Sequence, residues 1–123
     1  MALILIVEDY PSLQKIYSEA LQMAGHEFML AKDGAEALQK VAERTPDLIL
    51  LDLLMPEFNG MEFLKKFDAK KHPGTKVIII TNMNNPILRA QLSALGASQY
   101  LTKSEYTPKE LMNIVDNTLR KAS

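Results

Sequence analysis

The stretch DLILLD at residues 47–52 decides the fold of this chain. Four consecutive apolar residues between two acids are typical of a short strand buried on both faces, as in parallel sheets. A carboxylate at the end of such a strand lies at the rim where open α/β folds bind ligands. A second run, LILIV at residues 3–7, is followed in the same way by Glu8 and Asp9. Two strands that deliver acids to one rim indicate a carboxylate cluster, which a cation or a proton must neutralise.

The composition is that of one ordinary globular domain. The chain has 123 residues, of which 47% are hydrophobic and 24% are charged, and its net charge is −1. That charge, without a basic stripe, argues against direct nucleic-acid binding. There is no cysteine, which excludes disulfides, and no apolar run approaches the roughly 18 residues of a membrane span. Because the N-terminus also lacks a signal-peptide pattern, we expect one cytoplasmic domain, residues 1–123, without membrane insertion.

Strand patterns alternate with helical patterns along the chain. We predict strands at residues 3–7, 27–31, 48–51, 76–80 and 99–101. Helices are predicted at about 11–24 and 85–95, and three more follow the caps at Asp33, Asn59 and Thr107. Five strands alternating with five helices predict parallel strands joined by right-handed crossovers, a doubly wound α/β sandwich. If the strand order is 2-1-3-4-5, the first and third strands are neighbours and their acids share a crevice.

Apolar spacing predicts which face each helix buries. The first helix is expected to bury Leu13, Ile16, Tyr17, Ala20, Leu21 and Ala24, and the second Ala37, Leu38, Val41 and Ala42. The third is expected to bury Phe63, Leu64 and Phe67, and the fifth Leu111, Ile114, Val115 and Leu119.

Motifs at the ends of four strands resemble those of a known family. They are Glu8-Asp9, the segment from Asp52 to Gly60, Thr81, and Gly96-Ala97 followed by residues 100–103. In this order they are similar to the receiver domain of bacterial two-component response regulators, over nearly the whole chain. The resemblance implies a flavodoxin-like three-layer sandwich with a five-stranded parallel sheet in the order 2-1-3-4-5. It also implies a phosphoacceptor signalling switch of a His-Asp phosphorelay, with no enzymatic activity beyond its own phosphorylation and dephosphorylation.

The resemblance implies a role for each acid and for one lysine. Asp52 is the expected phosphoacceptor, which attacks a phosphoryl group and forms an acyl phosphate. Asp9 and Asp52 are expected to bind Mg²⁺, or Mn²⁺, with the backbone carbonyl of Leu54. Glu8 is expected to hold the cation or its waters from just outside the ligand set. Lys103 is expected to pair with Asp52 and then with the phosphoryl oxygens.

The resemblance also implies a switch and partners. Thr81 is expected to donate its hydroxyl to the phosphoryl group, and the Tyr100 rotamer to follow Thr81. The surface of the fourth helix, fifth strand and fifth helix would then change its affinity for a downstream protein. The expected phosphoryl donor is a histidine kinase or a phosphotransfer protein. The domain is expected to be a monomer or a phosphorylation-dependent dimer.

The chemistry of these residue types agrees with the implied roles. The three acids carry −3 and Lys103 carries +1, so the pocket holds −2, which one divalent cation cancels. Mg²⁺ prefers one or two carboxylates together with waters and phosphate oxygens. Phosphoryl transfer needs positioning and charge neutralisation, and a carboxylate is a competent nucleophile.

The chain departs from the family pattern around Lys103 and Thr81. Ser104 follows Lys103 where the family usually has proline, often after a cis bond. A cis bond before a non-proline residue costs about 3–4 kcal/mol, so we predict a trans bond. Asn82 replaces the usual alanine or glycine and is expected to narrow access to the phosphoryl pocket. Met83 and Leu54 lie where the family varies its dephosphorylation rate, and because neither orients an attacking water, we predict slow loss of phosphate.

Other hypotheses are open at this point. A haloacid-dehalogenase-type phosphatase also forms an aspartyl phosphate, but it expects a second acid where Leu54 stands. A non-phosphorylated interaction module would keep only the fold, and the intact set of acids, threonine and lysine argues against it. Taken one at a time, the site residues could also have purely structural roles. The acids could be helix or loop caps, Thr81 could be an ordinary strand end, and Lys103 could be a solvated lysine. The chain ends soon after the fifth helix, which fits both a stand-alone receiver and a receiver cut from a longer regulator.

Overall fold

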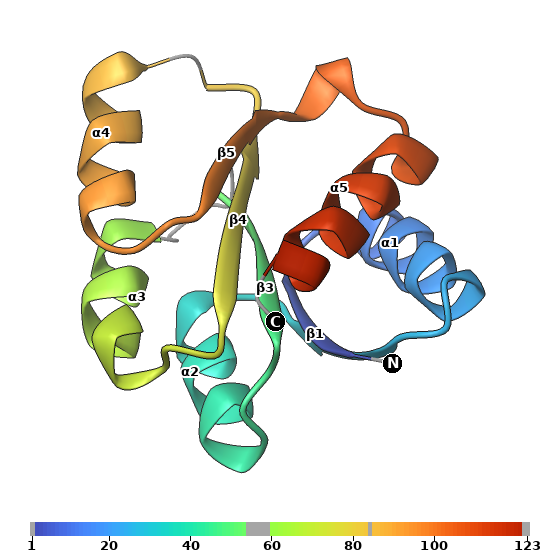
Figure 1. The fold of residues 1–123 in the computed structure, drawn as a ribbon, viewed down its shortest axis with the longest axis horizontal. Helices are drawn as coiled ribbons and strands as arrows, with labels where there is room; N and C mark the ends of the chain where they lie inside the picture. The colour runs from blue at the N-terminus through green and yellow to red at the C-terminus, as the bar shows by residue number, and fades with distance from the viewer. Residues whose placement is uncertain (1, 54–59, 84, 122–123) are drawn as a thin grey trace.

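The computed structural model describes residues 2–53, 60–83 and 85–121. In this part of the chain, strands and helices alternate as predicted (Figure 1). The strands are β1 (Leu3–Val7), β2 (Glu27–Ala31), β3 (Leu48–Asp52), β4 (Lys76–Thr81) and β5 (Gln99–Thr102). The helices are α1 (Pro11–Met23), α2 (Gly34–Glu43), α3 (Gly60–Phe67), α4 (Pro86–Ala94) and α5 (Pro108–Lys121). Two short 3₁₀ turns, η1 (Ala69–Lys71) and η2 (Lys103–Glu105), follow α3 and β5.

The five strands form one parallel sheet in the order β2-β1-β3-β4-β5, which confirms the predicted topology. The central position of β1 and β3 follows from their composition, since every residue in both strands is buried. Val7 pairs with Leu51, so Glu8 and Asp52 occupy the next pair of positions at the carboxyl edge. The chain leaves β1 toward β2 on one side and enters β3 on the other, which places a topological switch point at these two acids.

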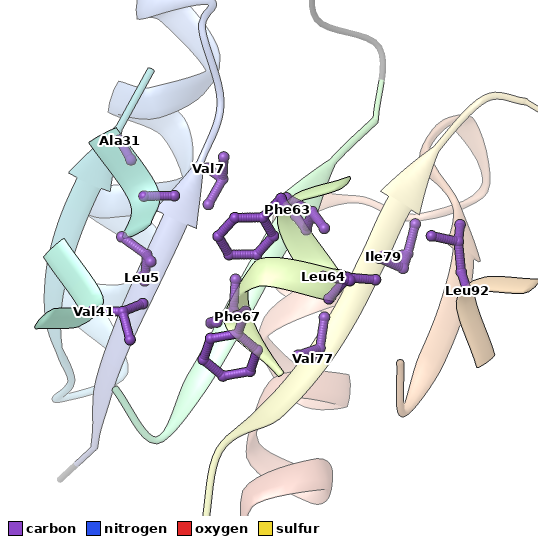
Figure 2. Packing of buried hydrophobic residues seen from close by; sticks show 13 residues of the cluster. Leu5, Val7, Ala31, Val41, Phe63, Leu64, Phe67, Val77, Ile79 and Leu92 are labelled. Atoms are coloured by element: carbon purple, nitrogen blue, oxygen red, sulfur yellow. The ribbon is translucent and has the colours of Figure 1, made fainter. Parts of the chain in front are cut away.

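Side chains alternate between the two faces of the sheet and build two separate cores. One core lies under α2, α3 and α4, and Figure 2 shows Leu5, Phe63 and Phe67 in it. Ile49 and Leu51 of β3 belong to the same core. The other lies under α1 and α5, on the opposite face in Figure 1, and contains the alternate strand residues with helix residues of α1 and α5. Because the side chains of β3 alternate between the two cores, both helix layers pack against the strand that ends in Asp52.

The predicted helix starts are confirmed where the structure describes them. Asp33 accepts a hydrogen bond from the Glu36 N–H at 2.7 Å. Thr107 and Glu110 form a reciprocal capping box, with distances of 3.0 and 3.1 Å. Asn59, the predicted cap of α3, lies outside the described residues.

Several predicted boundaries and burial assignments were wrong by small amounts. The strands β3, β4 and β5 each extend one residue further, to Asp52, Thr81 and Thr102. Backbone pairing does not depend on side-chain polarity, so it continues past the last apolar residue. Ile16 is 41% exposed, because it lies next to Tyr17 in sequence and therefore about 100° around the helix from the buried face. Ala24 and Ala42, at the ends of their helices, are also exposed.

Candidate functional site

The site is built around two buried carboxylates at the carboxyl edges of β1 and β3. Glu8 is 1% exposed and Asp52 is 2% exposed. Glu8 lies directly after β1, and Asp52 is the last residue of β3 and still pairs with Ile80 of β4. The backbone of Asp52 is therefore held by the sheet itself. Two acids buried at adjacent strand ends repel each other unless something neutralises them.

Lys103 supplies one neutralising charge. Its ammonium donates a hydrogen bond to Oδ2 of Asp52 at 2.6 Å and to Oε1 of Glu8 at 3.2 Å. The side chain is 18% exposed, so most of its aliphatic stem is covered by protein. Lys103 directly follows β5, so its side chain reaches across the end of β4 to Asp52 on β3 and on to Glu8, which follows β1. The structure thus brings together three predicted site residues from three separate parts of the chain.

The electrostatics of the three groups are coupled. Burial, reinforced by the hydrogen bond and the charge of Asp52, raises the pKa of Glu8 from 4.5 to about 7. Burial alone would lower the pKa of Lys103, but the hydrogen bonds and charges of Asp52 and Glu8 outweigh it and raise that pKa. The pocket therefore carries more negative charge than one lysine can neutralise, and a proton on Glu8 compensates in part.

The donor set suits a hard divalent cation. The described residues contain no group of three or more histidine, cysteine, aspartate or glutamate side chains arranged as a metal cage. Mg²⁺ does not need such a cage, because it binds one or two carboxylates and completes its shell with water and phosphate. Asp9 is half-buried and follows Glu8 at the same rim, and the surplus charge on Glu8 and Asp52 favours a cation there. Leu54, the predicted third ligand, lies outside the described residues.

The two predicted switch residues, Thr81 and Tyr100, both form hydrogen bonds with the backbone of Met83. Thr81, at the end of β4, is fully buried, and its Oγ1 accepts a hydrogen bond from the Met83 N–H at 3.1 Å. Tyr100 of β5 donates its hydroxyl to the carbonyl of Met83 at 2.9 Å. The guanidinium of Arg89 lies 5.7 Å from the centroid of the Tyr100 ring. The backbone of Met83 is therefore a physical link between Thr81 and Tyr100.

The departures around Lys103 have a clear structural outcome. The described residues contain no cis peptide bond, so the Lys103–Ser104 bond is trans, as predicted. The N–H of Ser104 donates a hydrogen bond to Oδ1 of Asn82 at 2.8 Å. Asn82 is exposed, with its amide oxygen engaged by this contact rather than by the phosphoryl pocket.

Two residues of the site have no sequence motif that identifies them. Gln14 of α1 donates a side-chain hydrogen bond to the backbone carbonyl of Glu8. Tyr17, predicted only as a core residue, is buried, and burial raises the pKa of its phenol within the field of Lys103, Glu8 and Asp52. The only sequence signal of their proximity is the position of Gln14 one turn before Tyr17 in the predicted helix, and the contact of Gln14 with Glu8 appears only in the structure. Glu8 itself accepts a hydrogen bond from the Tyr10 N–H at 3.2 Å, and α1 has no side-chain cap at Tyr10.

Comparison with known proteins decides the family. The family model described as the response regulator receiver domain matches residues 4–116. The chain belongs to this family. The receiver domain resembles the alkaline phosphatase synthesis regulator PhoP of Bacillus subtilis, with 31% identity over 97% of this chain and 49% of that protein. It is also 33% identical to the DNA-binding response regulator MtrA of Mycolicibacterium smegmatis, over 96% of this chain and 50% of that protein. The chain thus spans about half the length of the curated relatives it matches.

Solved receiver domains share the same architecture. A CheY-like receiver domain protein of Methanospirillum hungatei JF-1 superposes with a TM-score of 0.90 at 27% identity, covering 99% of this chain and 96% of that one. The chemotaxis protein CheY4 of Vibrio cholerae gives a TM-score of 0.86 at 32% identity, covering 95% and 98% of the two chains. These matches confirm the flavodoxin-like fold and a receiver of the two-component type. They give no support to a dehalogenase-type phosphatase or to an interaction module that keeps only the fold.

Family membership carries coarse functional statements with it. Receiver domains are signalling switches that take part in their own phosphorylation and dephosphorylation, and they generally bind Mg²⁺ at an acidic pocket. They interact with histidine kinases or phosphotransfer proteins. Among the described residues, no helix has the length and apolar character that crossing a membrane requires.

Proposed function

We propose that this receiver stores a phosphoryl group on Asp52 and reports its presence through the α4–β5–α5 surface. The observation that carries the proposal is the position of the Lys103 ammonium, 2.6 Å from Asp52 and 3.2 Å from Glu8, at the switch point of the sheet. A buried carboxylate beside a fixed cation can act as a nucleophile while the charge of the incoming phosphoryl group is neutralised. We take residues 1–123 as the extent of the domain.

The chemical step transfers one phosphoryl group. A carboxylate oxygen of Asp52 forms a bond to phosphorus, and the bond from phosphorus to the donor's imidazole nitrogen breaks. The electron pair of that bond leaves with the imidazole, and an acyl phosphate remains on Asp52. Lys103 turns from the carboxylate of Asp52 to an oxygen of the transferred group, and Thr81 donates its hydroxyl to another oxygen. Hydrolysis by water restores the carboxylate of Asp52 and releases phosphate.

The acidic rim would hold the divalent cation. Asp9 and Asp52, with the backbone carbonyl of Leu54, would be its protein ligands, and Glu8 would hold its waters. When bound, Mg²⁺ or Mn²⁺ supplies positive charge that offsets the carboxylates and the phosphoryl oxygens. Ionisation of Glu8 accompanies this binding, because its raised pKa of about 7 reflects burial beside Asp52. We therefore expect cation binding to release a fraction of a proton at neutral pH.

The signal would leave through Met83 and the edge of the sheet. If Thr81 turns its hydroxyl toward the phosphoryl group, its contact with the Met83 N–H is lost, and the Met83 carbonyl that receives the Tyr100 hydroxyl shifts with it. Exposed residues beside this loop, among them Ile87 at 73% exposure and Arg89, would present a different surface. This is a shift between two pre-existing states, which phosphorylation biases.

The partners follow from the same reading. A cytoplasmic histidine kinase or phosphotransfer protein would present phosphohistidine to the rim, and a downstream protein would read the α4–β5–α5 surface. A phosphorylation-dependent dimer through that surface is an alternative output to a monomeric switch. Several relatives are named as transcriptional or DNA-binding regulators, so control of transcription is one output that a longer form of this protein would have.

One experiment tests the central assignment. The protein is incubated with acetyl phosphate and Mg²⁺, and the phosphorylated fraction is measured by intact mass, with hydroxylamine sensitivity as the test for an acyl phosphate. Wild type should be modified and Asp52→Asn should not. Asp47→Asn is the matched control, because Asp47 precedes the same strand at its opposite end, where its carboxylate accepts a hydrogen bond from the Leu3 N–H at 2.8 Å. Modification of Asp52→Asn at the wild-type rate would show that the proposal is wrong.

A further inference from the structure

The two residues that depart from the family pattern contact each other. The backbone N–H of Ser104 donates a hydrogen bond to Oδ1 of Asn82 at 2.8 Å, although the residues are 22 positions apart in sequence. Proline at position 104 has no N–H and could not make this contact. Alanine or glycine at position 82 has no side-chain acceptor. The two departures are therefore complementary: Ser104 supplies the donor of this hydrogen bond and Asn82 supplies its acceptor.

The contact lies directly beyond the end of the β4–β5 pairing. The last paired residues are Thr81 and Thr102, so Asn82 and Lys103 come next along the two strands. Past this point η2 begins and the backbone of β5 no longer runs alongside β4. The amide side chain of Asn82 takes up the Ser104 N–H and extends the attachment of the two segments by one further step.

This hydrogen bond fixes the backbone on the far side of Lys103, which lies between Thr102 and Ser104. The backbone before Lys103 is held by the sheet at Thr102, and the backbone after it is held by Asn82 at Ser104. The ammonium of Lys103 has to reach past β4 to Asp52, at 2.6 Å, and to Glu8 beyond it, at 3.2 Å. A long, flexible lysine reaches two acceptors at once only if its backbone is in the right place.

We propose that Asn82 is a positioning residue for Lys103, acting through the backbone N–H of Ser104 in place of the proline that the family usually has there. The inference rests on the proposed function, in which Lys103 neutralises the phosphoryl group on Asp52. The inference gives Asn82 a role in the phosphorylation of Asp52. The effect of Asn82 on the rate of dephosphorylation is a separate property. Loss of one such hydrogen bond should slow phosphorylation of Asp52 about three- to ten-fold.

The experiment measures the rate of phosphorylation by acetyl phosphate at saturating Mg²⁺ for a set of variants of residues 1–123. Asn82→Ala removes the acceptor and Ser104→Pro removes the donor, whereas Ser104→Ala keeps the backbone N–H and is the matched control. Asn82→Ala is also made together with Lys103→Met. Mg²⁺ affinity is measured in parallel by calorimetry, because a general disruption of the pocket would lower it.

The inference predicts that Asn82→Ala and Ser104→Pro slow the reaction, that Ser104→Ala does not, and that Mg²⁺ affinity is retained. In the Lys103→Met background, Asn82→Ala should change the residual rate less than about twofold, because that variant has no ammonium group for Asn82 to position. An Asn82→Ala rate equal to wild type, or an equal loss in the Lys103→Met background, would overturn the inference. If Ser104→Pro does not fold, Asn82→Ala and Ser104→Ala decide. Absence of phosphorylation in wild type would instead overturn the proposed function itself.

Discussion

The ammonium nitrogen of Lys103 lies 2.6 Å from Oδ2 of Asp52, although the two residues are 51 positions apart and separated by a strand. Both side chains are largely buried, so this contact is screened far less than a surface ion pair. The same contact that neutralises the resting carboxylate holds a cation beside the atom that would react. The pair therefore links the stability of the metal-free pocket to its chemistry.

Replacement of Lys103 by methionine should slow phosphorylation of Asp52 strongly. Methionine keeps much of the aliphatic stem but removes the charge, so the phosphoryl oxygens lose one preorganised cation. We expect a decrease of at least about tenfold with acetyl phosphate at saturating Mg²⁺, measured by intact mass. Lys109→Met, at an exposed lysine in the first turn of α5, should react at the wild-type rate. Equal rates for the two variants would contradict the role given to Lys103.

The raised pKa of Glu8 predicts a pH dependence of the metal-free protein. An acid whose pKa is raised from 4.5 to about 7 binds its proton more tightly in the folded state. Its stabilising contribution is complete below the unfolded pKa and is lost as the pH rises through about 7. In urea unfolding with a chelator, wild type should therefore lose up to about 3 kcal/mol relative to Glu8→Gln between pH 4.5 and pH 8.

The same titration predicts the opposite trend for the cation. Mg²⁺ affinity of wild type should rise across the pH range in which Glu8 ionises, and Glu8→Gln should show a shallower rise. Calorimetry at several pH values checks this. Parallel slopes for wild type and Glu8→Gln, in unfolding and in Mg²⁺ binding alike, would mean that Glu8 does not carry the proton.

The loop residues after Thr81 predict a long-lived acyl phosphate. Met83 is 37% exposed and apolar, and the amide oxygen of Asn82 is bound to Ser104, so neither is placed to orient a water molecule. The Asn82→Ala, Met83→Ala double variant opens the approach to phosphorus and should shorten the phosphate half-life at least about twofold. Decay is followed after the phosphoryl donor is removed by desalting. A wild-type half-life no longer than that of the double variant would refute this prediction.

Gly96 predicts a local stability effect at the end of α4. Its φ is +107°, and a Cβ added there would lie 2.5 Å from the Cβ of Ala69. Gly96→Ala should cost about 2–5 kcal/mol, because left-handed strain adds to overpacking. Gly25 has a φ of +85° with nothing within 4 Å, so Gly25→Ala should cost only about 1–2 kcal/mol. Urea unfolding of both variants separates the two causes, and equal losses would show that contact with Ala69 does not matter.

The sequence predicted most of the fold because apolar runs and caps are local signals. The starts of all five strands and the reciprocal cap at Thr107 were predicted correctly. Strand ends were less predictable, since Asp52 and Thr81 keep pairing through their backbones after the apolar run has stopped. Ile16 was misassigned because hydrophobicity alone does not set the orientation of a helix on the sheet.

The composition of the site and the pairing of Lys103 with Asp52 were predicted through the family resemblance, and the pairing is confirmed, but the other contacts of the site were not predicted. The chain order of Glu8, Asp52 and Lys103 matched the family, whereas the shared contact of both acids with one ammonium appears only in three dimensions. The pairing of Asn82 with Ser104 could not be predicted, because no local pattern connects residues 22 positions apart in sequence. Leu54 lies outside the described residues, so its role as a ligand stays a prediction.

The order of strands in the sheet has a consequence for where motion can occur. Asp52 is on β3, which has a paired strand on each side, whereas Tyr100 is on β5, a four-residue strand with one neighbour. Local opening requires the least free energy where fewest strands must separate. The proposed phosphoacceptor therefore lies on a strand that is paired on both sides, whereas the proposed readout residue lies on the edge strand, where local opening costs least. A chemical event too small to distort the interior can in this way be expressed as a displacement at the periphery.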